Sequence, residues 1–110
     1  MSAYVDNIIE WPSTGIRFRG REQRKWCHLI ADTAEELHAM AQRIGMRRSW
    51  FQTASLPHYD LTPTRRAAAI RAGALPLERR EFVTKMREVR ASVKSGRFEG
   101  IQAAELKGES

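Results

Sequence analysis

Residues 26–46 read WCHLIADTAEELHAMAQRIGM, a pattern that predicts a β-strand followed directly by an α-helix. The first part is apolar at nearly every position, which is typical of a strand buried on both faces of a sheet. The Thr-Ala-Glu-Glu run that starts at Thr33 is a capping box, a common beginning of a helix. Gly45, followed by an apolar residue, is the matching pattern for a helix end. We therefore expect a central strand over 26–31 and a helix over 34–44.

Shorter elements are predicted on both sides of this unit from turn and capping residues around apolar runs. In chain order they are a strand over 3–5, a connection over 7–25, a strand over 49–53, a loop over 56–60, a helix over 63–73, an edge strand over 74–77 and a helix that ends near Gly96. Because strands alternate with helices, we expect one α/β domain over residues 1–96, with about four short strands in a largely parallel sheet packed with three helices. Residues 97–110 are expected to form a polar tail. The first two strands are joined without an obvious helix, so that pair is also compatible with an antiparallel arrangement.

Composition favours one cytoplasmic domain with an anionic partner. A chain of 110 residues has room for one core, and no apolar run approaches the roughly 18 residues of a membrane span. The N-terminus lacks a signal-peptide pattern, and the single cysteine, Cys27, cannot form an internal disulfide. The formal charge is +6, and Arg supplies 15 of the 19 basic residues, although a GC-rich genome would also explain that preference. The charge favours a small anionic ligand or nucleic acid, and the oligomeric state stays open, a homodimer included.

The aspartates and histidines gather near predicted element ends. Asp6 closes the first strand, and Asp32 closes the central strand. His58 and Asp60 occupy the loop before the second helix, and His28 lies within the central strand. Because α/β sheets bind ligands at the carboxyl ends of their strands, these residues are candidates for one pocket. The alternatives are that aspartates end strands for turn or capping reasons, and that a histidine within a strand is a hydrogen-bonded core residue.

Two basic residues at the start of the second helix are unexpected. Arg65 and Arg66 occupy its first turn, where the helix dipole disfavours positive charge. Their guanidinium groups, together with the free amides of the helix start, would suit a phosphate or a carboxylate. Alternatively, both side chains point to solvent or pair with Asp60.

The function favoured by these patterns is binding of a small phosphorylated ligand, such as a nucleotide or a nucleotide-derived signal. In this hypothesis the two arginines hold the phosphate, Tyr59 stacks on a base, and histidines and carboxylates set the orientation. The predicted ligand-binding residues are His28, Asp32, His58, Tyr59, Asp60, Arg65 and Arg66. We expect the segment 58–60 to lie beside the start of the second helix and to face the Asp32 end of the central strand.

Two alternative functions remain open, and the sequence does not decide whether the chain is an enzyme. The first is a metal-dependent phosphoester hydrolase or nuclease, with Mg²⁺ or Mn²⁺ as the cation. Its expected ligands are Asp6, Asp32, His58 and Asp60. The second is binding of nucleic acid or protein through a basic loop over residues 16–25. The basic side chains of that loop are Arg17, Arg19, Arg21, Arg24 and Lys25.

Several segments together resemble an uncharacterised family of phages and bacteria, the domain of unknown function numbered 4031. The matching segments are Tyr4-Val5-Asp6, Trp11-Pro12, Trp26-Cys27-His28-Leu29, Ala31-Asp32-Thr33, Glu36-Leu37-His38, Ile44-Gly45, Trp50-Phe51, His58-Tyr59-Asp60 and Arg66 to Ala74. Family members commonly carry a second Asp where this chain has Asn7, which argues against two carboxylate ligands at the first strand. Some relatives resemble fusions to a nucleotide-type phosphohydrolase domain, so the resemblance implies nucleotide or phosphate ligands by association. It implies no known activity.

Overall fold

The central strand of the sheet is β5, Lys25–Ala31, as its apolar sequence predicts. It pairs along one edge with β1 (Ala3–Val5) and β2 (Ile9–Glu10) and along the other with β6 (Tyr59–Leu61). A further strand, β7 (Leu75–Pro76), extends the sheet beyond β1. The computed structural model describes residues 2–10, 24–53, 56–96 and 98, and the backbone of residues 17–18 and 21–22. The expected α/β class is confirmed.

The sheet is mixed, so the expectation of a largely parallel sheet is wrong. Strands β1, β2 and β6 all run antiparallel to β5, and among the described strands only the β1–β7 pair is parallel. The segment 49–53, expected to be a strand, instead begins with the short 3₁₀-helix η1, Arg48–Trp50. Gln52 then pairs antiparallel with His58, so the chain reverses direction before it enters β6. This reversal is the reason that β6 returns antiparallel to β5.

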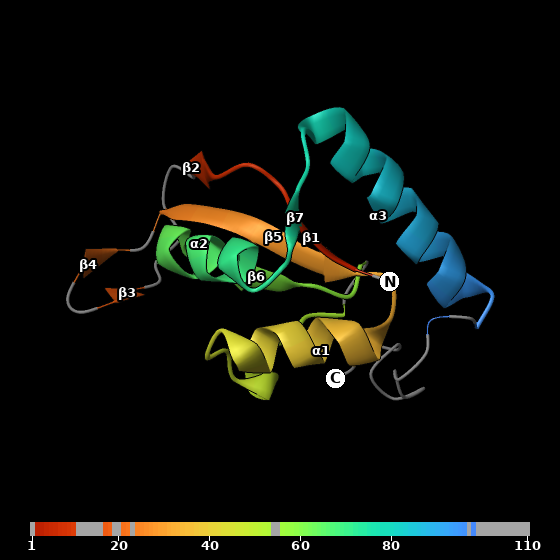
Figure 1. The fold of residues 1–110 in the computed structure, drawn as a ribbon, viewed down its shortest axis with the longest axis horizontal. Helices are drawn as coiled ribbons and strands as arrows, with labels where there is room; N and C mark the ends of the chain where they lie inside the picture. The colour runs from red at the N-terminus through yellow and green to blue at the C-terminus, as the bar shows by residue number, and fades with distance from the viewer. Residues whose placement is uncertain are drawn as a thin grey trace.

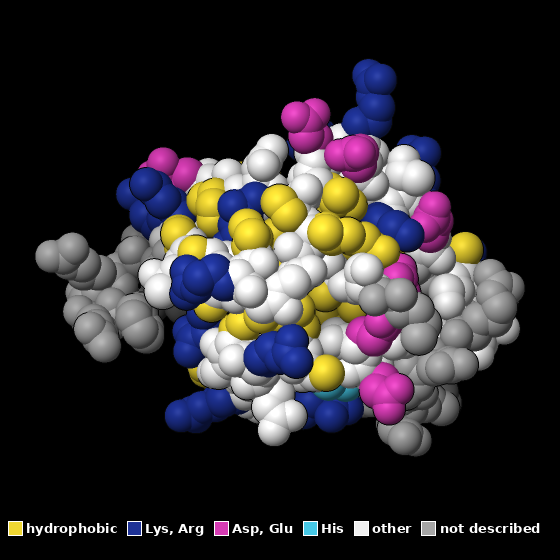
Figure 2. Space-filling view, in the orientation of Figure 1, with side chains coloured by type: hydrophobic (Ala, Val, Ile, Leu, Met, Phe, Trp, Pro, Cys, Tyr) yellow, Lys and Arg dark blue, Asp and Glu magenta, His cyan; other side chains and the backbone are white. Residues whose placement is uncertain are grey.

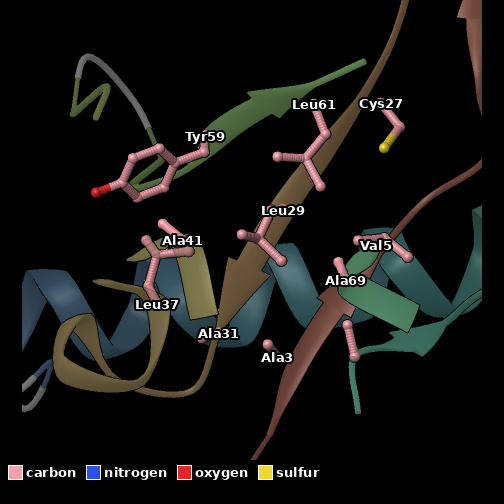
Figure 3. Packing of buried hydrophobic residues seen from close by; sticks show 11 residues of the cluster. Ala3, Val5, Cys27, Leu29, Ala31, Leu37, Ala41, Tyr59, Leu61 and Ala69 are labelled. Atoms are coloured by element: carbon pink, nitrogen blue, oxygen red, sulfur yellow. The ribbon is translucent and has the colours of Figure 1, made fainter. Parts of the chain in front are cut away.

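Helices cover both faces of the sheet. Because side chains alternate along a strand, Cys27, Leu29 and Ala31 face α1 (Ala34–Arg43) and α2 (Pro63–Arg71). Ile30 faces α3, Arg79–Lys94, on the opposite side, and Figure 1 shows α1 and α3 on opposite sides of β5. Figure 3 shows Leu29 at the middle of the first cluster, with side chains of α1, α2 and β6 around it. None of the described helices combines the length and apolar character needed to cross a bilayer.

The helix ends follow the sequence signals closely. The Thr33 hydroxyl accepts the Glu36 amide at 3.1 Å, although the Glu36 carboxylate bonds the Thr33 hydroxyl rather than the Thr33 amide. At the C-terminal end of α1, Gly45 has φ 81°, and the two hydrogen bonds of a Schellman motif end the helix. The second helix starts as predicted, with the Thr62 hydroxyl accepting the Arg65 amide.

One extra residue between β1 and β2 forms a bulge along the edge of β5. Val5 pairs with Leu29 and Ile9 pairs with Trp26, so a step of four residues (9 − 5) opposes a step of three (29 − 26). A β-bulge of this kind bends the strand and redirects its side chains. The predicted connection over 7–25 therefore contains β2, and it also contains a small hairpin of β3 (Arg17–Phe18) and β4 (Arg21–Glu22). Of the expected tail, Phe98 is described and is buried on the α3 side.

Candidate metal centre

The side chains of His28, His58 and Asp60 lie close together on the face of the sheet that α3 covers. One ligand atom from each lies within 4.8 Å of the others. The register of the sheet brings them together, because His28 of β5 pairs directly with Asp60 of β6. His58 precedes Asp60 by two residues, so strand alternation turns both side chains to the same face. We call this cluster the His-His-Asp centre.

The His28 ring is oriented by Asp6 at the bulge. Asp6 Oδ2 lies 2.8 Å from His28 Nδ1, and Asp6 Oδ1 accepts the His28 main-chain N–H at 2.6 Å. The hydrogen bond to Asp6 raises the pKa of His28, although burial opposes this shift. When Nδ1 donates its proton to Asp6, Nε2 carries the lone pair of the neutral ring and is the atom free to bind a cation.

The His58 ring is oriented by a main-chain oxygen. Its Nδ1 lies 2.6 Å from the carbonyl oxygen of Leu56, which can only accept, so Nδ1 carries a proton. Its Nε2 then faces Asp60 Oδ1 at 3.3 Å. A neutral Nε2 and a carboxylate oxygen are both electron-pair donors, so this contact needs a positive charge between them. A metal ion placed between them would meet that need and would bind both ligands at once.

Asp60 is held as a carboxylate. Gln52 Nε2 donates to Asp60 Oδ2 at 2.7 Å, which fixes the second oxygen and leaves Oδ1 directed at the histidines. Burial alone would raise the pKa of Asp60, but hydrogen bonds with His58 and Gln52 outweigh it, and the pKa is lowered. The group is therefore ionised near neutral pH, as a metal ligand must be.

Two imidazoles and one carboxylate favour a transition metal. Imidazole nitrogen suits zinc, iron and other transition ions, whereas Mg²⁺ prefers oxygen ligands. Of the two ions expected from the sequence, Mg²⁺ is therefore disfavoured, and zinc and iron(II) join manganese as the favoured ions. Histidines that bind metals usually donate their other ring N–H to a carboxylate or a carbonyl, which is the arrangement that Asp6 and Leu56 provide. Three protein ligands leave coordination positions for water or a substrate.

The centre is open to solvent on one side and bounded by aromatic rings on the other. The His28 side chain is 32% exposed and that of Asp60 is 38% exposed. Phe82 of α3 stacks on His28 with ring centroids 6.4 Å apart, and the two imidazoles meet edge to face at 5.5 Å. A ligand can thus reach the donor atoms, while α3 limits the directions from which it approaches.

Asp32 does not belong to this centre, so the expected pocket between Asp32 and the segment 58–60 is wrong. Asp32 lies four residues beyond His28, about 13 Å away at roughly 3.3 Å per residue. Its carboxylate accepts the Ser2 amide at 2.9 Å and the Tyr4 hydroxyl, and it pairs with Lys85 at 3.5 Å. The antiparallel return of β6 explains the error, because it pairs Asp60 with His28 at the middle of β5 rather than placing it beside the end of β5.

Three further candidates hold the fold together. Tyr59, expected to stack on a base, is 1% exposed, and its hydroxyl bonds His38 Nδ1 at 2.8 Å. Arg65 bonds the carbonyl oxygens of Ile44 and Gly45 at the end of α1, and Arg66 bonds the main-chain oxygen of Asp6. These two arginines therefore brace the end of α1 and the bulge, and their bonds do not direct them into the His-His-Asp centre.

The basic loop lies largely outside the described side chains. The side chains of Arg17, Arg19 and Arg21 are not among those described, whereas Arg24 and Lys25 are exposed at the start of β5. Sequence reasoning missed Gln52, Leu56 and Phe82 as partners of the centre. The His-Tyr-Asp run at 58–60 carried a usable signal, because a strand reading would have placed His58 and Asp60 on one face and the buried Tyr59 on the other.

Comparisons with known proteins place the chain in a family without assigning it an activity. Searches of curated proteins and of solved structures find no match. A family model matches residues 4–89, a range that contains Asp6 and all three residues of the His-His-Asp centre. The chain therefore belongs to the family described as "Protein of unknown function (DUF4031)".

Proposed function

We propose that this protein is a metal-dependent hydrolase of phosphoesters, with His28, His58 and Asp60 as the metal ligands. The observation that carries the proposal is the orientation of the donor atoms. Both imidazoles have Nδ1 engaged by fixed acceptors, and the ligand atoms of the three residues lie within 4.8 Å of one another. Of the functions considered from the sequence, the metal-dependent one has the best structural support, with His28 in place of Asp32 and with Asp6 as the partner of His28 rather than as a ligand.

The chemistry follows from an ion with open coordination positions. Such an ion can hold a phosphoryl oxygen and lower the pKa of a bound water, so that the water attacks at neutral pH. In the reaction, the water oxygen forms a new bond to phosphorus and the ester P–O bond breaks. The proton that the water loses ends on the leaving oxygen. The ionised Asp60 and the two imidazoles keep the ion in place throughout.

A phosphorylated substrate is supported by charge. The chain carries a formal charge of +6, which attracts anions to its surface. A small phosphorylated compound, a nucleotide included, remains the substrate class expected from the sequence. Arg65 and Arg66 have no part in holding its phosphate in this proposal, because both bond main-chain oxygens.

The test measures metal binding first and hydrolysis second. Protein stripped with EDTA is titrated calorimetrically with Zn²⁺, Mn²⁺ and Fe²⁺, and the loaded forms are assayed on a nitrophenyl phosphodiester and a panel of nucleotides. We expect one ion per chain, and hydrolysis only in a loaded form. Asp60→Asn should abolish both, whereas Asp32→Asn, the matched change at a carboxylate outside the centre, should abolish neither. Equal behaviour of the two variants, or no stoichiometric ion, contradicts the proposal. Metal-independent binding of a nucleotide would instead support a pure binding domain.

A further inference from the structure

A basic surface lies at the C-terminal end of α1, in η1 and along α2. It consists of Arg43, Arg47, Arg65 and Arg71 around Trp50, and we call it the arginine surface. Contacts join its members: Arg43 bonds the Ala72 carbonyl oxygen beside Arg71, and Arg65 bonds the end of α1. The Cζ atoms of Arg47 and Arg65 lie 5.7 and 5.5 Å from the centre of the Trp50 ring.

The charge of this surface is not neutralised within the described part of the chain. The ion pairs found there join carboxylates to His28, His58 and Lys85, and none includes one of the four arginines. Figure 2 shows dark-blue side chains over α2 and the C-terminal end of α1 with no magenta side chain among them. A group of like charges held together without counter-charge favours a polyanionic partner.

The contacts with Trp50 leave the arginines able to bind such a partner. A guanidinium group that makes a cation–π contact with an indole does not spend its N–H groups on that contact, so they can still form bidentate bonds to phosphate. Arg47 and Arg71 form no hydrogen bond or ion pair within the described residues, so their donors are available. The Trp50 side chain is itself 42% exposed, which leaves part of the indole open to a base or a sugar.

We propose that the arginine surface binds the backbone of single-stranded nucleic acid. A duplex reader needs an element that enters a groove, whereas this surface is formed by a helix end, a 3₁₀ turn and a helix side. A membrane-binding surface needs several apolar side chains to insert, whereas Trp50 is the one exposed large apolar residue in the described parts of these elements. Arginines combined with an aromatic ring are the usual means of holding a single strand without sequence preference.

The position of the surface relates it to the His-His-Asp centre. Trp50 precedes Gln52 by two residues, and Gln52 bonds the metal ligand Asp60. The arginine surface lies on the α1 and α2 side of the sheet and the centre on the α3 side, so a strand held on this surface would reach the centre only around the sheet edge at Gln52, with nucleic acid as the phosphoester substrate. This role as a substrate surface rests on the proposed function, whereas the binding itself requires no metal.

Binding is tested in EDTA, where hydrolysis and metal binding have no part. Fluorescence anisotropy follows a labelled oligothymidylate of about 16 nucleotides, near the upper end of ordinary site sizes, across a range of salt concentrations. We expect binding that weakens with salt, and a tighter complex than with a duplex of the same length. In the variant Arg47→Ala/Arg71→Ala, the slope of log K against log salt should become less steep by about 1.4, from about 0.7 per lost phosphate contact.

The matched control is Arg87→Ala/Arg90→Ala, which removes the same charge from exposed positions of α3. Its slope should stay at the wild-type value, and both variants should unfold at the wild-type temperature. An equal loss in the two variants would show general attraction to a basic protein and overturn the assignment, as would tighter duplex binding. Binding of anionic vesicles in place of the oligonucleotide would overturn it in favour of a membrane. Retained binding in EDTA with no hydrolysis by any loaded form would overturn only the proposed function.

Discussion

Asp32 and Asp60 lie on the same face of the sheet, Asp32 just after the end of β5 and Asp60 opposite its middle residue His28, and their partners differ in kind. The carboxylate of Asp32 meets a lysine ammonium, a tyrosine hydroxyl and a main-chain amide, all of which are hydrogen-bond donors. The carboxylate of Asp60 meets one amide donor and an imidazole nitrogen whose other nitrogen is already committed as a donor. Groups of the protein therefore balance the negative charge of Asp32, whereas the negative charge of Asp60 calls for a further cation. Comparing the donors around two carboxylates thus distinguishes a structural ion pair from a cation site.

The largest expected effect is the loss of a metal ligand. Replacing His58 with alanine removes one of three ligands, and we expect the affinity for Zn²⁺ to fall by more than about 100-fold, beyond the loss typical of an outer partner. Titration calorimetry on the stripped protein measures this loss. Lys85→Met, which removes the cation beside Asp32, is the matched control and should leave the affinity unchanged. A His58 variant with normal affinity would show that the two carboxylate sites do not differ as argued.

A smaller effect is expected at Asp6, which touches the proposed centre only through His28. In Asp6→Ala the His28 ring loses the acceptor for Nδ1, and the affinity for Zn²⁺ should fall by about 10–100-fold. The same variant removes the acceptor of the His28 main-chain N–H, so its urea unfolding is measured in parallel. Asp6→Asn keeps a possible acceptor oxygen and should recover part of the affinity. A loss of stability in urea without any change in metal affinity would limit Asp6 to a structural role.

Loss of Lys85, which pairs with Asp32, should affect the stability of the protein and not its affinity for metal. Lys85→Met removes the ion pair with Asp32, and its apolar chain can still cover the Tyr4 ring, over which the ammonium now lies at 4.9 Å. The hydrogen bond with Glu88 is the largest cause of the raised pKa of Lys85, and the lysine is partly exposed, so the pair with Asp32 is screened by solvent. We expect a loss of at most about 1 kcal/mol in the free energy of unfolding, measured by urea denaturation. A loss of several kcal/mol would mean that the pair behaves as a buried one.

The smallest effect is expected at Cys27, which is next to His28 in sequence but on the other face of β5. Burial raises the pKa of its thiol to about 12, so thiolate is scarce at pH 8. A thiol reagent should label the native protein very slowly and label it rapidly in urea. Cys27→Ser should bind Zn²⁺ with wild-type affinity. Rapid native labelling that metal suppresses would place the thiol in the centre and require a different ligand set.

Local signals predicted the helices and the central strand well, because capping residues and apolar runs act over a few neighbouring positions. The Thr33 cap, the Gly45 end and the apolar run of β5 are of this kind. The candidate centre was predicted in part: Asp6, His28, His58 and Asp60 were all singled out, and the structure brings them together. The prediction that Asp32 shares this centre is wrong because the direction of β6 depends on a chain reversal, which no short pattern encodes.

The partners of Tyr59 and Arg65 could not be inferred for a related reason. A strand of three residues gives too few positions to show alternation, so the sequence predicts a loop at β6 and a ligand-binding role for its buried tyrosine. Arg65 carries a charge that suits a phosphate, but the end of α1 lies beside it only in the folded chain. The choice between a ligand and a helix end was thus made by tertiary contacts.

The bulge between β1 and β2 makes this edge of the sheet sensitive to the length of the segment over 6–8. The extra residue lets Ile8 pack against the core on the α1 side, while Ile9 beside Trp26 is 38% exposed on the other. Deleting Asn7 would restore an unbroken ladder, in which Ile8 lies opposite Cys27 and Ile9 stays opposite Trp26, so both isoleucines would keep their faces. The same deletion would move the bulge from which the Asp6 carboxylate bonds the main-chain nitrogen and the Nδ1 of His28. Within this segment, a substitution is a chemical change at one position, whereas the loss of one residue removes the bulge that sets the position of Asp6 beside His28.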